Sequence, residues 1–187
     1  MSDPRARRAL PPLDENRLRE LALRYVGRFA TTRAKLRAYL MRKLRERGWD
    51  GENNPDLEGI ADRFAEQGYI DDAGYALGKS RSLSGRGYGK RRVAHALRVA
   101  GIDEQDSEAA LEQADREAVA AALRFAEKRR IGPFAVARTT DPRDREKLLA
   151  AMLRAGHPLG LSRAILAHLP GESIDEHALR EAAAYRG

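Results

Sequence analysis

The fold is decided by residues 70–102, which read IDDAGYALGKSRSLSGRGYGKRRVAHALRVAGI. The stretch opens with two aspartates, and an Asp at this place can accept hydrogen bonds from the free N–H groups of a helix start. Glycine then alternates with larger residues over 85–89. A second helical pattern follows at about 90–100 and ends at Gly101, a residue suited to the left-handed position after a helix. The stretch therefore predicts helix, turn, helix.

The same plan occurs on both sides of this stretch. The middle helix of each predicted unit ends at a glycine, namely Gly48, Gly101 and Gly156, and these are 53 and 55 residues apart. A nearly constant spacing over three copies is typical of a repeat protein. No alternating hydrophobic and polar run of strand length stands out. We therefore predict an all-α fold of three tandem three-helix repeats, with an elongated or crescent-shaped form.

The predicted boundaries follow from this spacing and from composition. Residues 1–13 are rich in Pro and Arg, lack periodicity, and are expected to form a disordered basic arm. The expected repeats cover 14–68, 69–114 and 115–170. A C-terminal helix or tail over 171–187 completes the chain.

Helix starts and inward faces can also be predicted. An Asp that follows a hydrophobic residue precedes three of the helices, at Asp14, Asp71 and Asp175, and each can cap its helix. Pro55 is expected at the first position of the third helix, where a missing N–H costs nothing. Recurrence at three and four residues indicates an amphipathic first helix. Its predicted inward stripe consists of Leu18, Leu21, Tyr25, Val26 and Phe29.

Composition argues against an enzyme. The 187 residues include no cysteine, which excludes disulfides, thiol nucleophiles and thiolate metal sites. The four histidines form no metal-binding pair, and no phosphate-binding loop or nucleophile elbow is present. His157, which follows the helix-ending Gly156, is expected to complement that helix end by its charge. We therefore predict no catalytic, metal or cofactor site, no membrane span and a cytoplasmic protein.

The charge is strongly segregated along the chain. The formal net charge is +7, and seven basic residues without an acidic one lie between Lys79 and Arg98. Seven acidic residues then lie between Asp103 and Glu117, with Arg116 as the single basic residue among them. This pattern predicts a positive face for nucleic acid or an acidic partner. A solvated, Arg-rich surface without a partner remains the alternative.

The glycine-rich turn is the strongest candidate for a binding site. Three cations, Lys90, Arg91 and Arg92, follow it at a helix start, where they are unfavourable for the helix dipole. A departure of this kind from the charge preference of a helix start is more common at functional positions. Free N–H groups at a helix start also suit a phosphate or carboxylate. The alternative is a flexible turn with solvated charges, in which Tyr88 is an anchor on the core.

Several short motifs lie in the decisive stretch and upstream of it. They are Ile70-Asp71-Asp72-x-x-Tyr75-Ala76, Ser80-Arg81, Arg86-Gly87-Tyr88-Gly89-x-x-Arg92-Val93 and Leu97-x-x-x-Gly101-Ile102, with Arg33-Ala34-x-Leu36 and Leu44-x-x-x-Gly48-Trp49 upstream. These motifs strongly resemble the RecX regulatory family over about 20–102, and only the pattern of helices continues over 103–170. Gly74 and Gly78 depart from the resemblance, because bulkier residues are usual inside that helix.

The resemblance implies a function. Such proteins bind in the groove of RecA recombinase filaments on single-stranded DNA and limit ATP hydrolysis, filament growth and strand exchange. We therefore expect a monomeric, non-enzymatic regulator that contacts RecA, and single-stranded DNA without sequence specificity. The candidate contact residues are Arg33, Lys35, Arg42, Lys43, Arg47, Arg81, Arg86, Tyr88, Lys90, Arg91 and Arg92.

Other functions remain open at this point. Three-helix units can resemble helix-turn-helix modules, so a DNA-binding regulator that acts without RecA is the main alternative. Its recognition helix would need side chains suited to base readout, whereas the polar face here is almost entirely Arg and Lys, which suits phosphate contacts. A scaffold without a nucleic-acid role would leave the segregated charge unexplained.

Overall fold

The computed structural model describes residues 11–184 and confirms the all-α fold. Within this range every regular element is helical, apart from an isolated bridge between Leu13 and Trp49. The chain divides into two compact parts, residues 1–75 and 76–187, which are described separately below.

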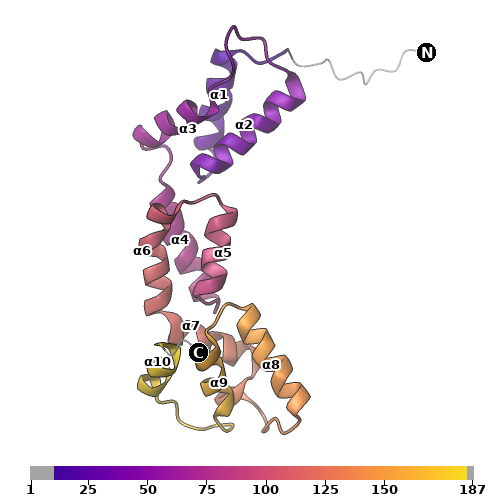
Figure 1. The fold of residues 1–187 in the computed structure, drawn as a ribbon, viewed down its shortest axis with the longest axis vertical. Coiled ribbons are helices and arrows are strands. Elements are labelled where there is room, and N and C mark those ends of the chain that lie inside the picture. Colours follow the sequence, from indigo (N-terminus) through magenta and orange to yellow (C-terminus); the bar gives the residue numbers. More distant parts are fainter. Residues whose placement is uncertain (1–10, 185–187) are drawn as a thin grey trace, which may run out of the picture. The chain divides into compact units, whose positions relative to one another are not determined.

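The first part is a three-helix unit in which α1 and α3 both pack on α2 (Figure 1). Its core is aliphatic, with Leu18, Leu36 and Leu40 almost completely buried. An apolar stripe of this kind holds a short helix in place, because helices of this length are marginal alone. The elements are α1 (Glu15–Val26), α2 (Arg33–Arg47), α3 (Leu57–Glu66) and the first turn of α4 (Asp72–Gly85).

The second part contains two further helical groups. In the first, α5 packs on α6, and the buried hydroxyl of Ser80 in α4 donates to the carbonyl of Ala110 in α6 at 2.8 Å. In the second, α9 lies against α7, α8 and α10 around Ile131, Met152 and Leu161. The elements are α5 (Lys90–Val99), α6 (Glu104–Arg116), α7 (Ala118–Arg129), the 3-10 helix η1 (Gly132–Phe134), α8 (Pro142–Arg154), α9 (Leu159–Ala167) and α10 (Glu176–Ala184).

The three predicted Asp caps are confirmed. The carboxylate of Asp14 accepts from the N–H of Arg17 at 2.8 Å, and that of Asp71 accepts from Gly74 at 2.7 Å. Asp175 accepts from the backbone of the helix that it precedes, at 2.9 Å. Each carboxylate satisfies an N–H group that has no partner within the helix.

Two local predictions were wrong. The third helix starts at Leu57 rather than at Pro55, because the carboxylate of Asp56 accepts from the N–H of Gly59 at 2.8 Å and caps the helix there. Helix α1 ends at Val26, so Phe29 lies beyond it and is 50% exposed instead of facing the core.

The predicted N-terminal arm differs from the structure, whereas the helix expected near the C-terminus is present. The expected arm over 1–13 is ordered at its end, because Leu13 is fully buried and exchanges hydrogen bonds with Gly48 and Asp50. The rest of the arm, 1–10, lies outside the described residues. At the other end, the helix expected within 171–187 is α10, and its Leu179 is buried in the same core as residues of α7 and α9.

The acidic stretch after Gly101 also has a structural role. Asp103 caps α6 by accepting from the N–H of Asp106 at 2.8 Å, and Glu104 and Asp106 lie in the first turn. Negative charge is favourable at this end of a helix. Among the described residues, no helix combines the length and the apolar character that crossing a membrane requires.

Candidate nucleic-acid interface

The glycine-rich turn is fixed by its packing on the third repeat. Gly87 has φ +89°, and a Cβ there would lie 2.9 Å from the backbone nitrogen of Phe125. A Cβ on Gly89 would collide with the carbonyl of Gly156. Both positions therefore need glycine, because two stretches of backbone approach each other where no side chain fits.

Three side chains of the third repeat hold the carbonyl groups of this turn. Arg124 donates to the carbonyl of Ser84 at 3.1 Å, and Lys128 donates to that of Arg86 at 3.2 Å. The buried imidazole of His157 contacts the carbonyl of Gly87 through Nε2 at 3.0 Å. The turn is therefore a rigid joint between repeats, and not the flexible turn that we considered.

His157 is neutral in this joint. Burial lowers its pKa to about 4, although the hydrogen bond to Gly87 acts in the opposite direction. Since a carbonyl can only accept, Nε2 carries the proton, and Nδ1 is left without a hydrogen-bond partner among the described residues. The prediction that His157 complements a helix end by its charge was therefore wrong.

The start of α5 is not open to an anion, contrary to our expectation. The N–H of Gly89 donates to the carbonyl of Ala155 at 2.9 Å, and that of Arg91 donates to the carbonyl of Gly156 at 3.3 Å. The C-terminal end of α8 thus supplies acceptors to two of the N–H groups that a phosphate would use. Any contact with a partner here must come from side chains.

Among the three cations at this helix start, only Lys90 has an ion-pair partner in the described chain. Its Nζ lies 3.2 Å from Asp115 Oδ2, and both side chains are partly exposed. Lys90 and Arg91 line an open hollow of about 400 Å³ beside the joint, which Asp115 also lines. Arg91 and Arg92 are exposed.

Two arginines lie close to the ring of Tyr88. The guanidinium carbon of Arg86 is 5.6 Å from the centre of the Tyr88 ring, and that of Arg92 is 5.9 Å from it. The ring is half-buried, whereas both arginines are exposed. The joint thus presents an aromatic ring with two cations close to it, an arrangement that suits both acidic groups and planar groups.

The first-repeat candidates are largely engaged within their own unit. Arg33 binds the buried carboxylate of Asp72 with its backbone N–H and with Nε, at 3.1 and 2.8 Å. Lys35 Nζ donates to the Tyr75 hydroxyl and lies over that ring. The Arg47 guanidinium donates twice to the carbonyl of Pro11, before α1, at 2.7 and 2.9 Å. These contacts give all three a structural role.

Arg42 and Lys43 both interact with one acidic side chain, that of Glu46. Lys43 Nζ binds Glu46 at 2.6 Å, and Arg42 Nε lies 3.6 Å from the same side chain. The two cations lower the pKa of the Glu46 carboxyl, chiefly through the hydrogen bond from Lys43. Arg81 in α4 is exposed and has no ion-pair partner within residues 11–184. Contact with a partner remains a prediction for all eleven candidates.

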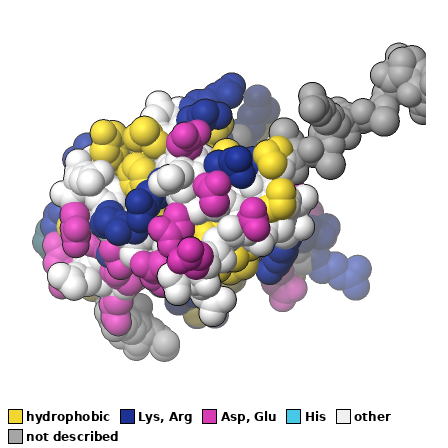
Figure 2. Space-filling view, turned by 90° about the horizontal axis from the view of Figure 1, so that it is seen from above, with side chains coloured by type: hydrophobic (Ala, Val, Ile, Leu, Met, Phe, Trp, Pro, Cys, Tyr) yellow, Lys and Arg dark blue, Asp and Glu magenta, His cyan; other side chains and the backbone are white. Residues whose placement is uncertain are grey.

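Charge of both signs is mixed over part of the surface. Figure 2 shows acidic, basic and hydrophobic side chains interspersed on the face that it presents. The net positive charge therefore does not coat that face, and the binding surface must be sought in local clusters of cations.

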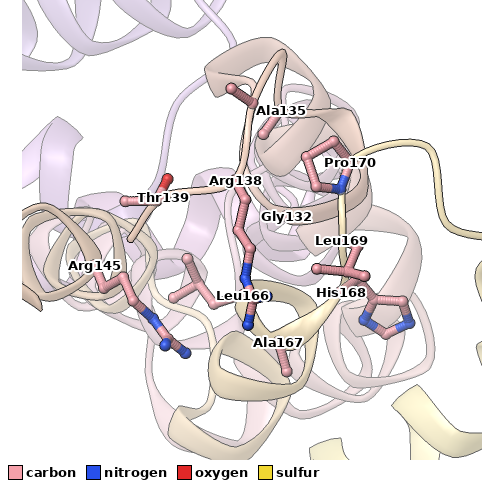
Figure 3. Close-up of a pocket in the computed structure, with 11 residues that line it drawn as sticks. Gly132, Ala135, Arg138, Thr139, Arg145, Leu166, Ala167, His168, Leu169 and Pro170 are labelled. Atoms are coloured by element: carbon pink, nitrogen blue, oxygen red, sulfur yellow. The ribbon is translucent and has the colours of Figure 1, made fainter. Parts of the chain in front are cut away.

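The third repeat holds a small hollow that the sequence did not predict. Figure 3 shows Arg138 and Arg145 beside Leu166 at this place. Its volume is about 40 Å³, far below that of a cofactor pocket. The described residues also include no group of three or more His, Cys, Asp or Glu side chains that could hold a metal ion.

Sequence reasoning missed the residues that build the joint. Arg124 and Lys128 are four positions apart on α7, so they lie on one face of that helix. This spacing was visible in the sequence. The residues that they bind are about 40 positions away, however, and only the fold brings the two segments together.

Tandem three-helix units with a rigid joint and exposed arginines define a helical-repeat protein. Residues 71–111 match the family described as RecX, second three-helix domain. "Regulatory protein RecX" of Myxococcus xanthus (strain DK1622) is 30% identical over 169 residues, covering 87% of this chain and 88% of the relative. The protein of the same name from Thermobifida fusca (strain YX) is 31% identical over 163 residues, covering 85% and 82%. The chain belongs to the RecX family of regulatory proteins.

Solved structures agree on the fold. The crystal structure of RecX from Lactobacillus salivarius matches with a TM-score of 0.58 at 18% identity, covering 81% of this chain and 93% of that chain. A second structure, described as regulatory protein RecX, matches with a TM-score of 0.57 at 21% identity, covering 81% and 70%. The helical repeats of this chain are thus those of its family.

Proposed function

We propose that this protein binds RecA filaments on single-stranded DNA and limits RecA's ATP hydrolysis, filament growth and strand exchange, without an activity of its own. The observation that carries the proposal is the fixed display of Arg86, Tyr88 and Arg92 at the joint. Because the backbone there is held by the third repeat, little conformational freedom is lost when the side chains bind a partner.

Membership of the RecX family supports this proposal. Exposed guanidinium groups suit phosphates and carboxylates, both of which a nucleoprotein filament offers. Arg81 and Arg91 are exposed on the helices that flank the joint and extend the set of candidate contacts. Contacts between guanidinium groups and phosphates do not depend on the identity of the bases, which agrees with a DNA partner of any sequence.

Base readout by a helix-turn-helix module has less support. In such modules the last helix enters the major groove with its outer face toward the bases. The corresponding helix α6 exposes Glu104, Glu108 and Glu112, and α3 exposes Glu58 and Asp62. Carboxylates on these faces would be repelled by the phosphates on both sides of the groove.

The test is a titration of the protein into an ATPase assay of cognate RecA on single-stranded DNA. We expect the ATP turnover of RecA to fall when the protein is added at well below one copy per RecA molecule. We expect the protein alone to hydrolyse no ATP. Unchanged turnover and unchanged filament length at equimolar protein would contradict the proposal. Sequence-specific duplex binding in a mobility-shift assay would then favour the DNA-binding alternative.

A further inference from the structure

Three aromatic rings of the first part form a continuous series, which we call the aromatic ladder. Tyr25 at the end of α1 stacks on Tyr39 of α2, with ring centres 4.3 Å apart and an angle of 15° between the ring planes. Tyr25 also contacts Phe29, with ring centres 5.3 Å apart and an angle of 50° between the ring planes. The ladder therefore runs in the order Tyr39, Tyr25, Phe29.

Cations lie at both ends of the ladder. The guanidinium carbon of Arg28 is 5.5 Å from the centre of the Phe29 ring. At the other end, Arg42 lies 5.5 Å and Lys43 Nζ 5.9 Å from the centre of the Tyr39 ring. Arg28 and Arg42 are exposed. No acidic side chain within residues 11–184 forms an ion pair with Arg28, so its charge is available to a partner.

Packing within the unit explains only part of the ladder. Tyr25 and Tyr39 are partly buried against the core of this unit. Phe29 lies beyond the end of α1, contacts the Tyr25 ring and keeps 50% of its surface exposed. A ring that only joined α1 to α2 would be covered. The ladder thus extends from the core to a half-exposed ring that has a cation beside it.

We infer that the aromatic ladder is a stacking platform for the bases of single-stranded nucleic acid. Every base has a π face, so stacking on aromatic side chains needs no particular sequence. The cations at both ends would then bind the backbone phosphates on either side of the stacked base. A duplex keeps its base faces inside its own stack, so the platform selects single strands.

This inference rests on the proposed function, because it names how the chain would contact the DNA of the filament. It can nevertheless be tested without RecA. The full chain is titrated into a fluorescently labelled oligo(dT) of about 20 nucleotides, and into an abasic strand of the same length with the same phosphates. Stacking requires bases, so we expect the abasic strand to bind about 5- to 150-fold more weakly.

Variants locate the site. Phe29→Leu removes the π face but keeps an apolar side chain, and it should weaken oligo(dT) binding about fivefold or more while leaving abasic binding unchanged. The matched control is Tyr69→Leu, because Tyr69 is 53% exposed in the same unit and its ring contact is with Phe64. Arg42→Ala should instead reduce the slope of log affinity against log salt by about one, which Phe29→Leu should not do. Circular dichroism checks that each variant retains its helices.

Equal affinity for the two strands, equal affinity for duplex and single strand, or parental binding by Phe29→Leu would overturn the inference. Its failure differs from failure of the proposed function. If the ladder is not a platform, RecA inhibition persists, and the affinity for oligo(dT) is the same in Phe29→Leu as in the parent. If the proposed function fails, RecA turnover is unchanged while oligo(dT) binding still depends on Phe29.

Discussion

The imidazole Nε2 of His157 and the carbonyl oxygen of Gly87 lie 3.0 Å apart, although 70 positions separate the two residues in sequence. The contact joins the turn before α5 to the turn after α8. Both groups are buried, and an unpaired buried group costs about 1–3 kcal/mol, so loss of either partner would loosen the joint.

This contact predicts a loss of stability in mild acid. The pKa of His157 is lowered to about 4 in the folded chain, against 6.5 in its ordinary state, so the unfolded chain binds the extra proton first. The stabilisation is therefore complete above pH 6.5 and is lost as the pH falls toward 4. At pH 5 the loss should be about 2 kcal/mol, measured by urea unfolding.

His157→Gln is the control for this experiment. Its amide can still donate to the carbonyl of Gly87 but does not titrate. The free energy of unfolding of this variant should depend less on pH between 4 and 6.5 than that of the parent. An identical pH dependence in the two proteins would show that other groups cause the acid sensitivity.

The joint should not tolerate a side chain at Gly87. Gly87→Ala forces a left-handed backbone on alanine and brings its Cβ within 2.9 Å of the Phe125 backbone. We expect a loss of about 2 kcal/mol or more in thermal or urea unfolding. Gly85→Ala is the matched control, since a Cβ there meets nothing within 4 Å and its φ is ordinary. Comparable losses in both variants would mean that backbone approach at the joint is not the cause.

The pair of Arg33 and Asp72 should contribute more to stability than other ion pairs of the first part. The Asp72 side chain is 6% exposed and binds both the backbone and the guanidinium of Arg33. Asp72→Ala leaves the partly buried donors of Arg33 without their acceptor, so we expect a loss of about 1–3 kcal/mol. Glu58→Ala removes a 68% exposed partner of Arg37 and should cost less than about 1 kcal/mol. Calorimetry of the two variants compares them directly.

Charge reversal at the joint tests the proposed binding surface. The double variant Arg86→Glu with Arg92→Glu should need about tenfold more protein for half-inhibition of RecA, since attraction becomes repulsion. Its helicity should be unchanged, because both side chains are exposed. Reversal of Arg138 and Arg145, which are also exposed, gives the same change in net charge and should have little effect. Equal inhibition by both double variants would remove the joint from the binding surface.

The sequence by itself determined the helices and the repeat. Capping by Asp14, Asp71 and Asp175, and glycines at constant spacing, act within a few residues of the chain. Such local interactions can be read from sequence because both partners are near each other. Where two local signals compete, as between Pro55 and Asp56, a single sequence offers no means to choose, and the predicted helix start lies two residues before the observed one.

Only the tertiary structure decided what the cations and glycines do. Arg33 and Arg81 look alike in the sequence, yet one binds a buried carboxylate 39 positions away and the other is exposed without an ion-pair partner within residues 11–184. The alternating glycines suggested an open anion site. In the structure, however, the carbonyls of Ala155 and Gly156 accept hydrogen bonds from the N–H groups of Gly89 and Arg91. The physical reason is the same in both cases. Charge and backbone freedom are properties of one residue, whereas a partner is set by packing between distant segments.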